Sequence, residues 1–531
     1  MFTLKPIQYD KLKEFPWQKK TTSKIVEAFH TERTKKGILF RAGTGLGKTH
    51  MFADALNQML GDGSFLQVPP GSCNPFPILV LTTASGVVET QRKLQTYGIG
   101  HLCMVMSYSQ LCYTGGKECQ NMFVSFVGCV DKDGNPDIQP VWNPWMLPAM
   151  VICDECQKIR NESSMRTRVI RELPKSVKVI HVSATPYQRI QDARAIVETL
   201  DVVTRFNNLK ATKETSAWIL REIASPKGIE EFSPSAMKRL RNELLPYMVE
   251  VKGVRFPFPA HSECVECDFA SPQDRMAYDQ AVVEWLEELR EAGKSAPKSR
   301  WGMMMASIIK FRQKCALLRA GPMADEAYIS YKSGMFPIVG ENFKDALRVI
   351  YLTLVKKHGV DKDHIAYIVG GQSQQVRQQM VDDFQSGRRK IMLVMIGAGG
   401  ESISLHHDNP NTLPRDVLIP ATWSAIEMAQ LLGRGHRLTS ISPTRQRVFW
   451  FKDTIESEKV KPKVERKFRC INSSIIAKEQ FASLFMPDEK TDEDVEELFA
   501  KCFERDNNDE ENEDDKEITG EGLGNEIEVE E

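Results

Sequence analysis

The sequence predicts an α/β protein of two doubly wound parallel sheets, joined by a helical insertion and followed by a disordered acidic tail. Short apolar runs of strand length alternate with helix-like runs over residues 37–186, and the same alternation returns over 336–450. The expected strands include 348–354, and residues 104–108 form another expected strand end. Residues 187–335 show helical charge patterns instead, at 235–245, 273–292 and 301–318, and the chain turns acidic from about residue 488. We therefore expect domains at 1–190, 191–335 and 336–487 and a tail at 488–531, disordered at least from 505.

A glycine-rich loop with a short apolar run before it and a helix-like run after it predicts a phosphate-binding site. The successive N–H groups of such a loop can turn toward one anion, so an adenosine triphosphate is the expected ligand. Lys48 would reach its β- and γ-phosphates, and the Thr49 hydroxyl would ligate Mg²⁺. The usual pattern opens with glycine, where this chain has alanine. The loop consists of Ala42, Gly43, Thr44, Gly45, Leu46, Gly47, Lys48 and Thr49.

Two segments near this loop predict further ligand contacts. Gln18 precedes the loop at the start of a helix-like segment, and its amide could pair with adenine, although a solvated glutamine is the commoner reading. The apolar run 77–84 reads as a buried strand that ends in hydroxyl side chains. Because ligands bind beyond the carboxyl ends of parallel strands, we expect Thr82, Thr83 and Ser85 to contact nucleic-acid phosphates.

An acidic pair follows another apolar run, at residues 150–157. Asp154 would hold the Mg²⁺, directly or through water, and Glu155 would orient the water that attacks the phosphate. An Asp-Glu pair after a strand is common, but its position about a hundred residues after a phosphate loop makes the prediction specific. A further strand over 179–186 ends in the sequence Ser-Ala-Thr-Pro.

Two arginines near the end of the second predicted α/β domain complete the constellation. Arg434 and Arg437 lie three residues apart, so we expect them to project from one face of a helix. Across a cleft between the two domains they could pair with the γ-phosphate and stabilise its charge during transfer.

These segments, in this order, resemble the motifs of superfamily-2 helicase-like ATPases over residues 15–450. The sequence from Asp154 to Asn161 looks most like that of Swi/Snf-type DNA translocases, with Gln157 in place of His and Arg160 in place of Lys. The resemblance implies two RecA-like lobes with ATP between them. It also implies a catalytic role for Gln157, a coupling role for Ser183, Thr185 and Gln430, and nucleic-acid contacts for Gly371 and Gly399.

The expected function is therefore an ATP-dependent helicase or translocase that acts on nucleic acid, with DNA more strongly indicated than RNA. An RNA helicase with the same motifs is one alternative, and a scaffold that binds ATP and nucleic acid without moving is another. Lys48, Glu155 and Arg437 are all present, which argues against the inert scaffold. A compact motor without an evident reader domain is also what a large DNA virus or a mobile element could encode.

Composition and charge limit the cellular compartment and the kind of binding partner that we expect. No apolar run reaches the ~18 residues of a membrane span, and the mixed, charged residues 1–20 do not read as a signal peptide. Twelve irregularly spaced cysteines indicate reduced thiols in the cytoplasm or nucleus. Residues 505–531 contain thirteen acidic and two basic residues, so the rest of the chain carries about +10. The positive charge of residues 1–504 could bind the phosphate backbone of a nucleic acid, or it could be scattered over a solvated surface. The acidic tail could compete with nucleic acid for its binding groove, or it could only aid solubility.

Overall fold

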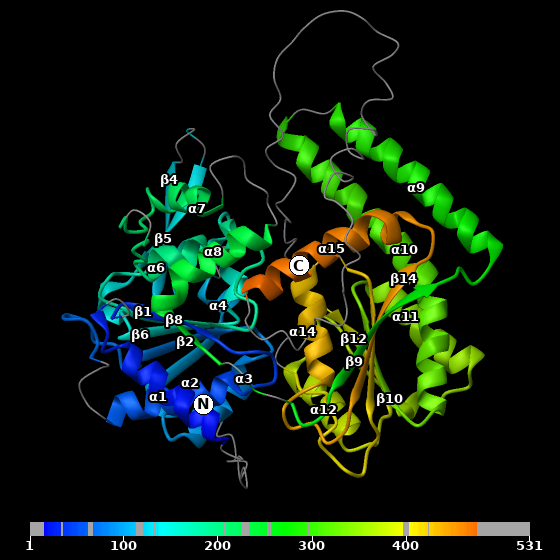
Figure 1. Ribbon diagram of the computed structural model, residues 1–531, viewed down its shortest axis with the longest axis horizontal. Helices are drawn as coiled ribbons and strands as arrows, with labels where there is room; N and C mark the ends of the chain where they lie inside the picture. The colour runs from blue at the N-terminus through cyan, green and yellow to red at the C-terminus, as the bar shows by residue number, and fades with distance from the viewer. Residues whose placement is uncertain are drawn as a thin grey trace, which may run out of the picture.

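The computed structural model describes residues 15–474, apart from 33–34, 62–66, 113–120, 131–133, 135, 206–207, 225–232, 252–253, 255, 295–296, 397–402 and 423. It contains two α/β lobes, each built around a six-stranded parallel sheet, which Figure 1 shows side by side. The predicted two-lobe architecture is thus confirmed, with helices between the two sheets in the chain. The acidic tail predicted at 488–531 lies outside the described residues.

The first sheet has six strands, and in four of them all or nearly all residues are buried, as parallel strands require when helices cover both faces of the sheet. Its order is β3 (Cys103–Ser107), β2 (Ile78–Thr82), β6 (Met150–Asp154), β7 (Lys178–Ser183), β1 (Gly37–Arg41) and the short β8 (Met248–Glu250). Because all the pairings are parallel, the loops that follow β1, β2, β6 and β7 meet at one edge of the sheet.

Helices cover the two faces of this sheet and enclose two apolar clusters. One face carries α1 (Pro16–Ala28), α2 (Lys48–Gly61) and α3 (Val87–Thr96). The opposite face carries α4 (Tyr108–Leu111), α5 (Met165–Arg171), α6 (Arg194–Thr199), α7 (Ser216–Ala224) and α8 (Pro234–Leu244), and Figure 1 shows the two groups on either side of the sheet. A small antiparallel sheet, β4 (Val124–Val130) with β5 (Pro136–Trp142), stands on this second face, where Trp142 Nε1 donates to the Val169 carbonyl of α5.

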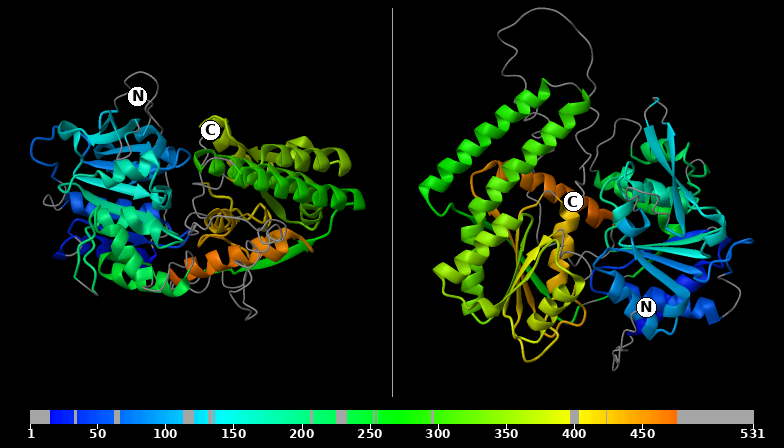
Figure 2. Two further views of the ribbon diagram at one scale, coloured as in Figure 1. Left: turned by 90° about the horizontal axis from the view of Figure 1, so that it is seen from above. Right: turned by 180° about the vertical axis from the view of Figure 1, so that it is seen from behind.

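The second sheet repeats the same design. Its order is β11 (Ile365–Ile368), β12 (Ile391–Met395), β10 (Phe336–Glu341), β13 (Arg415–Pro420), β14 (Thr444–Phe451) and β9 (Ala260–Cys267). The helices around it are α11 (Lys344–Leu352), α12 (Gln374–Gln385), α14 (Ala425–Gly435) and α15 (Lys461–Ser474). α15 packs along α8 of the first lobe, and all views in Figures 1 and 2 show this helix reaching across to the other lobe.

The region expected as a helical insertion contributes strands to both lobes. β8 belongs to the first sheet and β9 to the second, so residues 251–259 form the covalent linker between the lobes. Beyond β9, α9 (Pro272–Gly293) and α10 (Pro297–Lys332) pair as a long helical arm, seen at the top of Figure 1. The helical character expected for 273–292 and 301–318 agrees with these two helices, and the domain boundaries given above stay a prediction.

One local expectation was wrong. Residues 348–354 read as a strand from their apolar content, but Lys344–Leu352 is helix α11. Ala346, Leu347, Ile350 and Leu354 are all buried in one cluster, and this spacing of three to four residues places them on one helical face. The first strand after the helical arm is β10, whose six residues are all buried.

The described part of the chain contains no helix long and apolar enough to span a membrane.

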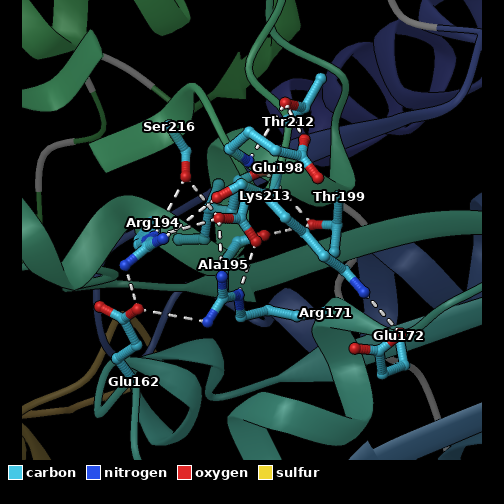
Figure 3. A network of polar contacts seen from close by, with 12 residues as sticks. Glu162, Arg171, Glu172, Arg194, Ala195, Glu198, Thr199, Thr212, Lys213 and Ser216 are labelled. Atoms are coloured by element: carbon cyan, nitrogen blue, oxygen red, sulfur yellow. Dashed lines mark hydrogen bonds and ion pairs between the residues drawn. The ribbon is translucent and has the colours of Figure 1, made fainter. Parts of the chain in front are cut away.

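An ion-pair network holds three helices of the first lobe together (Figure 3). Glu198 of α6, with its side chain 4% exposed, accepts two hydrogen bonds from Arg171 of α5, from Nε at 2.6 Å and Nη2 at 3.0 Å. The same carboxylate accepts from Arg194 Nε at 3.1 Å and from the Ser216 hydroxyl of α7. One buried carboxylate therefore satisfies donors from three separate elements.

We predict that Glu198→Ala lowers the free energy of unfolding of the first lobe by about 3 kcal/mol, because it leaves the largely buried guanidinium groups of Arg171 and Arg194 with only the half-exposed Glu162 as a carboxylate partner among the described residues. The matched control is Glu172→Ala, which removes a more exposed ion pair with Lys213 and should cost less than about 1 kcal/mol. Denaturant unfolding of the three proteins measures both values. Equal losses in the two variants would contradict the assignment.

Candidate active site

The phosphate loop lies where β1 ends and α2 begins. Arg41 is the last residue of β1, and Lys48 is the first residue of α2. Gly45 and Gly47 adopt φ angles of +77° and +76°, a conformation that side-chain-bearing residues rarely accept. Both glycines are therefore needed for the turn that leads the chain into the N-terminus of α2, where free N–H groups favour an anion.

Gln18 lies against this loop. Its side chain, in the first turn of α1, donates from Nε2 to the Leu46 carbonyl at 3.2 Å. A Cβ atom on Gly47 would lie 2.9 Å from the same Nε2, so the loop and α1 are in close contact. The structure thus places Gln18 at the phosphate loop, while its predicted pairing with adenine stays a prediction.

The acidic pair lies at a strained turn after β6. Glu155 has φ 52° and ψ 51°, which is a left-handed conformation that is uncommon for a residue with a side chain. Asp154, at the end of β6, accepts from Thr82 Oγ1 at 3.1 Å through Oδ2, and its backbone carbonyl accepts from the Tyr108 hydroxyl at 2.9 Å. Side chains from β2 and α4 therefore fix the residue that precedes the turn.

The charges of the pair depend on each other and on Lys48. Burial raises the pKa of Asp154 to about 6, and the neighbouring Glu155 adds to this rise. Burial also acts to raise the pKa of Glu155, but Lys48 and Arg434 outweigh it and the pKa is lowered. The pKa of Lys48 is lowered by burial and by the two arginines, against the opposing effect of both carboxylates. These groups are therefore close enough to form one electrostatic cluster.

A chain of hydrogen bonds connects Glu155 with the end of β7. Gln157 donates from Nε2 to Glu155 Oε2 at 2.9 Å, and the Ser183 hydroxyl donates to Gln157 Oε1 at 2.6 Å. The Thr185 N–H in turn donates to the Ser183 hydroxyl at 3.0 Å. Because Gln157, Ser183 and Thr185 are all buried, a movement of the β7 end would be transmitted to the Glu155 carboxylate.

The residues predicted to contact nucleic acid differ in their exposure. Thr82 is fully buried and bound to Asp154, so its assignment to nucleic acid was wrong: as the last residue of a central strand, it faces the acidic turn. Thr83 and Ser85 share a hydrogen bond of 3.2 Å beyond the strand end, where Ser85 is partly exposed. Gly371 is exposed with φ +83°, whereas Gly399 lies outside the described residues.

The arginines lie at the end of α14, in a geometry that differs from the expected one. Arg434 is in the last turn of the helix, but the helix ends at Gly435, and His436 is extended. Arg437 therefore does not share a helical face with Arg434, because the chain leaves the helix between them. Gln430, one helical turn before Arg434, is buried.

The arginine segment nevertheless lies directly against the phosphate loop. A Cβ atom added to Gly433 would lie 2.5 Å from Thr44 Oγ1, and one added to Gly45 would lie 3.1 Å from Arg437 Cα. Arg437 donates from Nη2 to the Ile403 carbonyl at 2.9 Å, while its buried Nε has no hydrogen-bond partner in the described residues. Burial and the nearby Arg434 lower the pKa of Arg437 to about 9. Two cations and an unsatisfied donor here suit a phosphate.

The oxygen atoms at the site also fit Mg²⁺. Asp154 offers a buried carboxylate with the Glu155 carboxylate beside it, and Thr49 offers a hydroxyl in the first turn of α2. Mg²⁺ typically takes one or two carboxylates and completes its shell with water and substrate phosphates. The described residues contain no cluster of three or more His, Cys, Asp or Glu side chains that could hold a metal by themselves.

Sequence reasoning missed Tyr108 and Leu438. Residues 104–108 were noted only as another strand end, yet the Tyr108 hydroxyl holds the Asp154 carbonyl. Leu438 belongs to the second lobe but packs in an apolar cluster of the first. For Tyr108 the signal was its position directly after β3, at the same edge of the sheet as Asp154; for Leu438 there was no signal, because a lobe contact leaves no local pattern.

Comparison with known proteins finds a relative in sequence and partial likenesses in structure. No protein-family model matches the chain. The chain is 22% identical over 461 residues to the Acanthamoeba polyphaga mimivirus protein named "Putative ATP-dependent RNA helicase L364", which covers 82% of this chain and 79% of that protein.

Solved structures with partial likeness include two chains. One is S. cerevisiae Dbp5 bound to RNA and ADP BeF3, with a TM-score of 0.40, 12% identity and coverage of 87% of this chain and 93% of the other. The other is the Sulfolobus solfataricus SWI2/SNF2 ATPase core in complex with dsDNA, with a TM-score of 0.33, 15% identity and coverage of 89% and 97%. The match to the viral protein covers most of both chains, and the ordered motifs on two parallel sheets are those of a helicase-type ATPase.

Proposed function

We propose that this chain is a nucleic-acid-stimulated ATPase that moves along DNA by opening and closing the cleft between its two lobes. The observation that carries the proposal is the contact of the arginine segment with the phosphate loop. Gly433 of the second lobe lies against Thr44 of the first, and Arg437 lies against Gly45. A site assembled from both lobes is the arrangement that links catalysis to a change in their relative position.

In this proposal the first lobe binds the nucleotide. The N–H groups of the phosphate loop and Lys48 hold the phosphates, and Gln18 supports the loop from α1. Thr49 and Asp154 would hold Mg²⁺, which supplies positive charge beside the β- and γ-phosphates. Asp154 is kept in place for this purpose by Thr82 and Tyr108.

Glu155 then orients the water that attacks the γ-phosphate. Its pKa is lowered by Lys48 and Arg434 despite burial, so the carboxylate is ionised at neutral pH and can accept a hydrogen bond from water. The charge that develops on the γ-phosphate meets Arg434 and Arg437, which stand at the loop only when the lobes are together.

The hydrogen-bonded chain from Glu155 to Thr185 supplies the coupling. It runs from the catalytic turn to the end of β7, on the edge of the sheet where the strand-end loops lie. We infer that nucleic acid bound near Thr83, Ser85 and Gly371 alters this chain and so the placement of Glu155. The positive charge of about +10 on residues 1–504 supports a phosphate backbone as the partner.

DNA is the proposed track because residues 154–161 look most like those of Swi/Snf-type DNA translocases. RNA is the alternative, since the mimivirus relative is named as an RNA helicase.

The test of this choice is the ATPase rate with duplex DNA, single-stranded DNA or RNA at equal nucleotide concentration. We predict the largest stimulation by duplex DNA, at least about 10-fold over the basal rate, and a fall with added salt, because phosphate contacts release counterions. Stimulation by RNA alone would replace the DNA assignment with the RNA alternative. No hydrolysis under any condition would leave only an inert scaffold.

A second prediction concerns Glu155. Glu155→Gln should still bind ATP, while hydrolysis falls at least ~100-fold because the water loses its orienting carboxylate. Lys48→Ala is the contrasting variant, since it should weaken ATP binding itself. Fluorescent-nucleotide binding and single-turnover hydrolysis separate the two effects. Near-normal hydrolysis by Glu155→Gln would remove this residue from the mechanism.

A third prediction concerns the second lobe. Arg437→Ala should bind ATP nearly normally and lose stimulated turnover by roughly 10³-fold, the scale of a lost arginine finger. Arg434→Ala should behave similarly, and the double variant should be little slower than either one, because both arginines serve one step. Stimulated and basal ATPase rates of the four proteins check this. Full stimulation of Arg437→Ala would show that the lobes do not close around the phosphates.

A further inference from the structure

The arginine segment is attached to the linker between the lobes through His436. This residue lies between the two arginines and directly after the end of α14. Its ring stacks on Phe256, with centroids 4.7 Å apart and planes at 29°, and its Nε2 lies 2.8 Å from the Phe258 carbonyl. A carbonyl can only accept, so Nε2 donates the proton of this hydrogen bond.

The linker in turn belongs to both lobes. Val251 and Val254 pack with Phe256 in the apolar cluster beneath the phosphate loop, which also contains Ala42 and Leu46. At its other end, Pro259 accepts a hydrogen bond of 3.2 Å from the Thr444 N–H of β14. The linker is therefore anchored in the first lobe up to Phe256 and in the second lobe from Phe258 onward.

A second contact reinforces the first. Leu438, directly after Arg437, packs in the same first-lobe cluster as Phe256. On the other side, the Thr444 hydroxyl donates to the Gly435 carbonyl at 3.0 Å and so holds the end of α14. Arg437 therefore lies between two residues, His436 and Leu438, that both contact groups packed on the first lobe.

We propose that His436 is a positioning residue, which locks the arginine segment to the interlobe linker so that lobe closure and arginine placement occur as one movement. This inference rests on the proposed ATPase function and extends it to a residue that does not itself touch the phosphates. Burial lowers the pKa of His436, although its contact with Phe258 acts to raise it, so the ring is neutral and keeps the donor that the carbonyl needs.

The physical reason is geometric. Without the ring, the backbone from Gly435 to Arg437 would lose its attachment to the linker. It would keep its hydrogen bonds with Thr444 and Ser440, which both belong to the second lobe, so the guanidinium could shift relative to the first lobe. A displacement of about 1 Å of a catalytic group can cost on the order of 100-fold in rate. The loss should therefore appear in kcat and not in the affinity for ATP, which the first lobe supplies.

The test compares substitutions that remove different parts of the contact. His436→Ala should lower the stimulated kcat by about 10- to 100-fold and change KM for ATP by less than about threefold. His436→Gln should recover most of the rate, because a glutamine amide can donate to the Phe258 carbonyl. Phe256→Leu should lower kcat in the same way, and adding it to His436→Ala should cost little more, since both act through one contact.

His358 offers a matched control. It lies in the same lobe, its ring stacks on Tyr328 at 4.2 Å, and its Nε2 lies 2.7 Å from Asp325. His358→Ala thus removes a comparable stack and hydrogen bond away from the phosphate loop, and it should leave the stimulated kcat unchanged. Thermal unfolding of all variants separates loss of fold from loss of rate.

The outcomes decide the proposal. It is wrong if His436→Ala keeps its stimulated kcat, if His436→Gln is as slow as His436→Ala, or if His358→Ala loses as much rate. Small-angle X-ray scattering without nucleotide gives a reading that needs no turnover: His436→Ala should be more extended than the wild type. If the wild type shows no ATPase activity but His436→Ala is still more extended, the proposed function is wrong and the role of the His436 contact stands. If the wild type shows no ATPase activity and the two proteins scatter identically, both proposals are wrong.

Discussion

The close approach of two glycines to the opposite lobe is the constraint on which the candidate site depends. Gly433 leaves room for Thr44, and Gly45 leaves room for the backbone of Arg437. A methyl group at either position would meet an atom of the other lobe at about 3 Å or less, and at Gly45 the left-handed backbone disfavours any side chain as well. The missing side chains allow two positively charged groups to stand at the phosphate loop without separating the lobes.

That approach concentrates charge, and two carboxylates partly offset the three cations of the site. Lys48, Arg434 and Arg437 face Asp154 and Glu155, and each group alters the pKa of its neighbours. Bound phosphates would add negative charge to the arginine side, where burial already lowers the pKa of Arg437. A bound nucleotide would thus relieve the repulsion between the two arginines, and nucleotide binding would therefore stabilise the closed cleft.

The motifs at strand ends could be predicted from the sequence, because residue type and spacing within a short segment are enough to recognise them. The phosphate loop, the Asp154–Glu155 pair and the Ser183–Thr185 end all lie at one edge of the first sheet, as parallel strands require. It could not predict which way a side chain faces at a strand end, so Thr82 was assigned to nucleic acid although it binds Asp154. It also placed a strand where α11 lies, because a short apolar run suits either element.

Contacts between the lobes could not be predicted from the sequence for another reason. Arg434 and Arg437 were expected on one helical face, but the helix ends at Gly435, and the segment after it takes its direction from the linker and from Leu438. Those partners lie far away in the sequence, so no periodicity within 425–437 encodes them. His436 shows the consequence: between two arginines it looks like an unremarkable polar residue, and only its stack on Phe256 and its bond to Phe258 show that the arginine segment and the interlobe linker form one unit. In the proposed mechanism, the attachment of the arginines to the linker means that lobe closure need not reach them through the sheet, because the same contact that moves the lobe moves the charge.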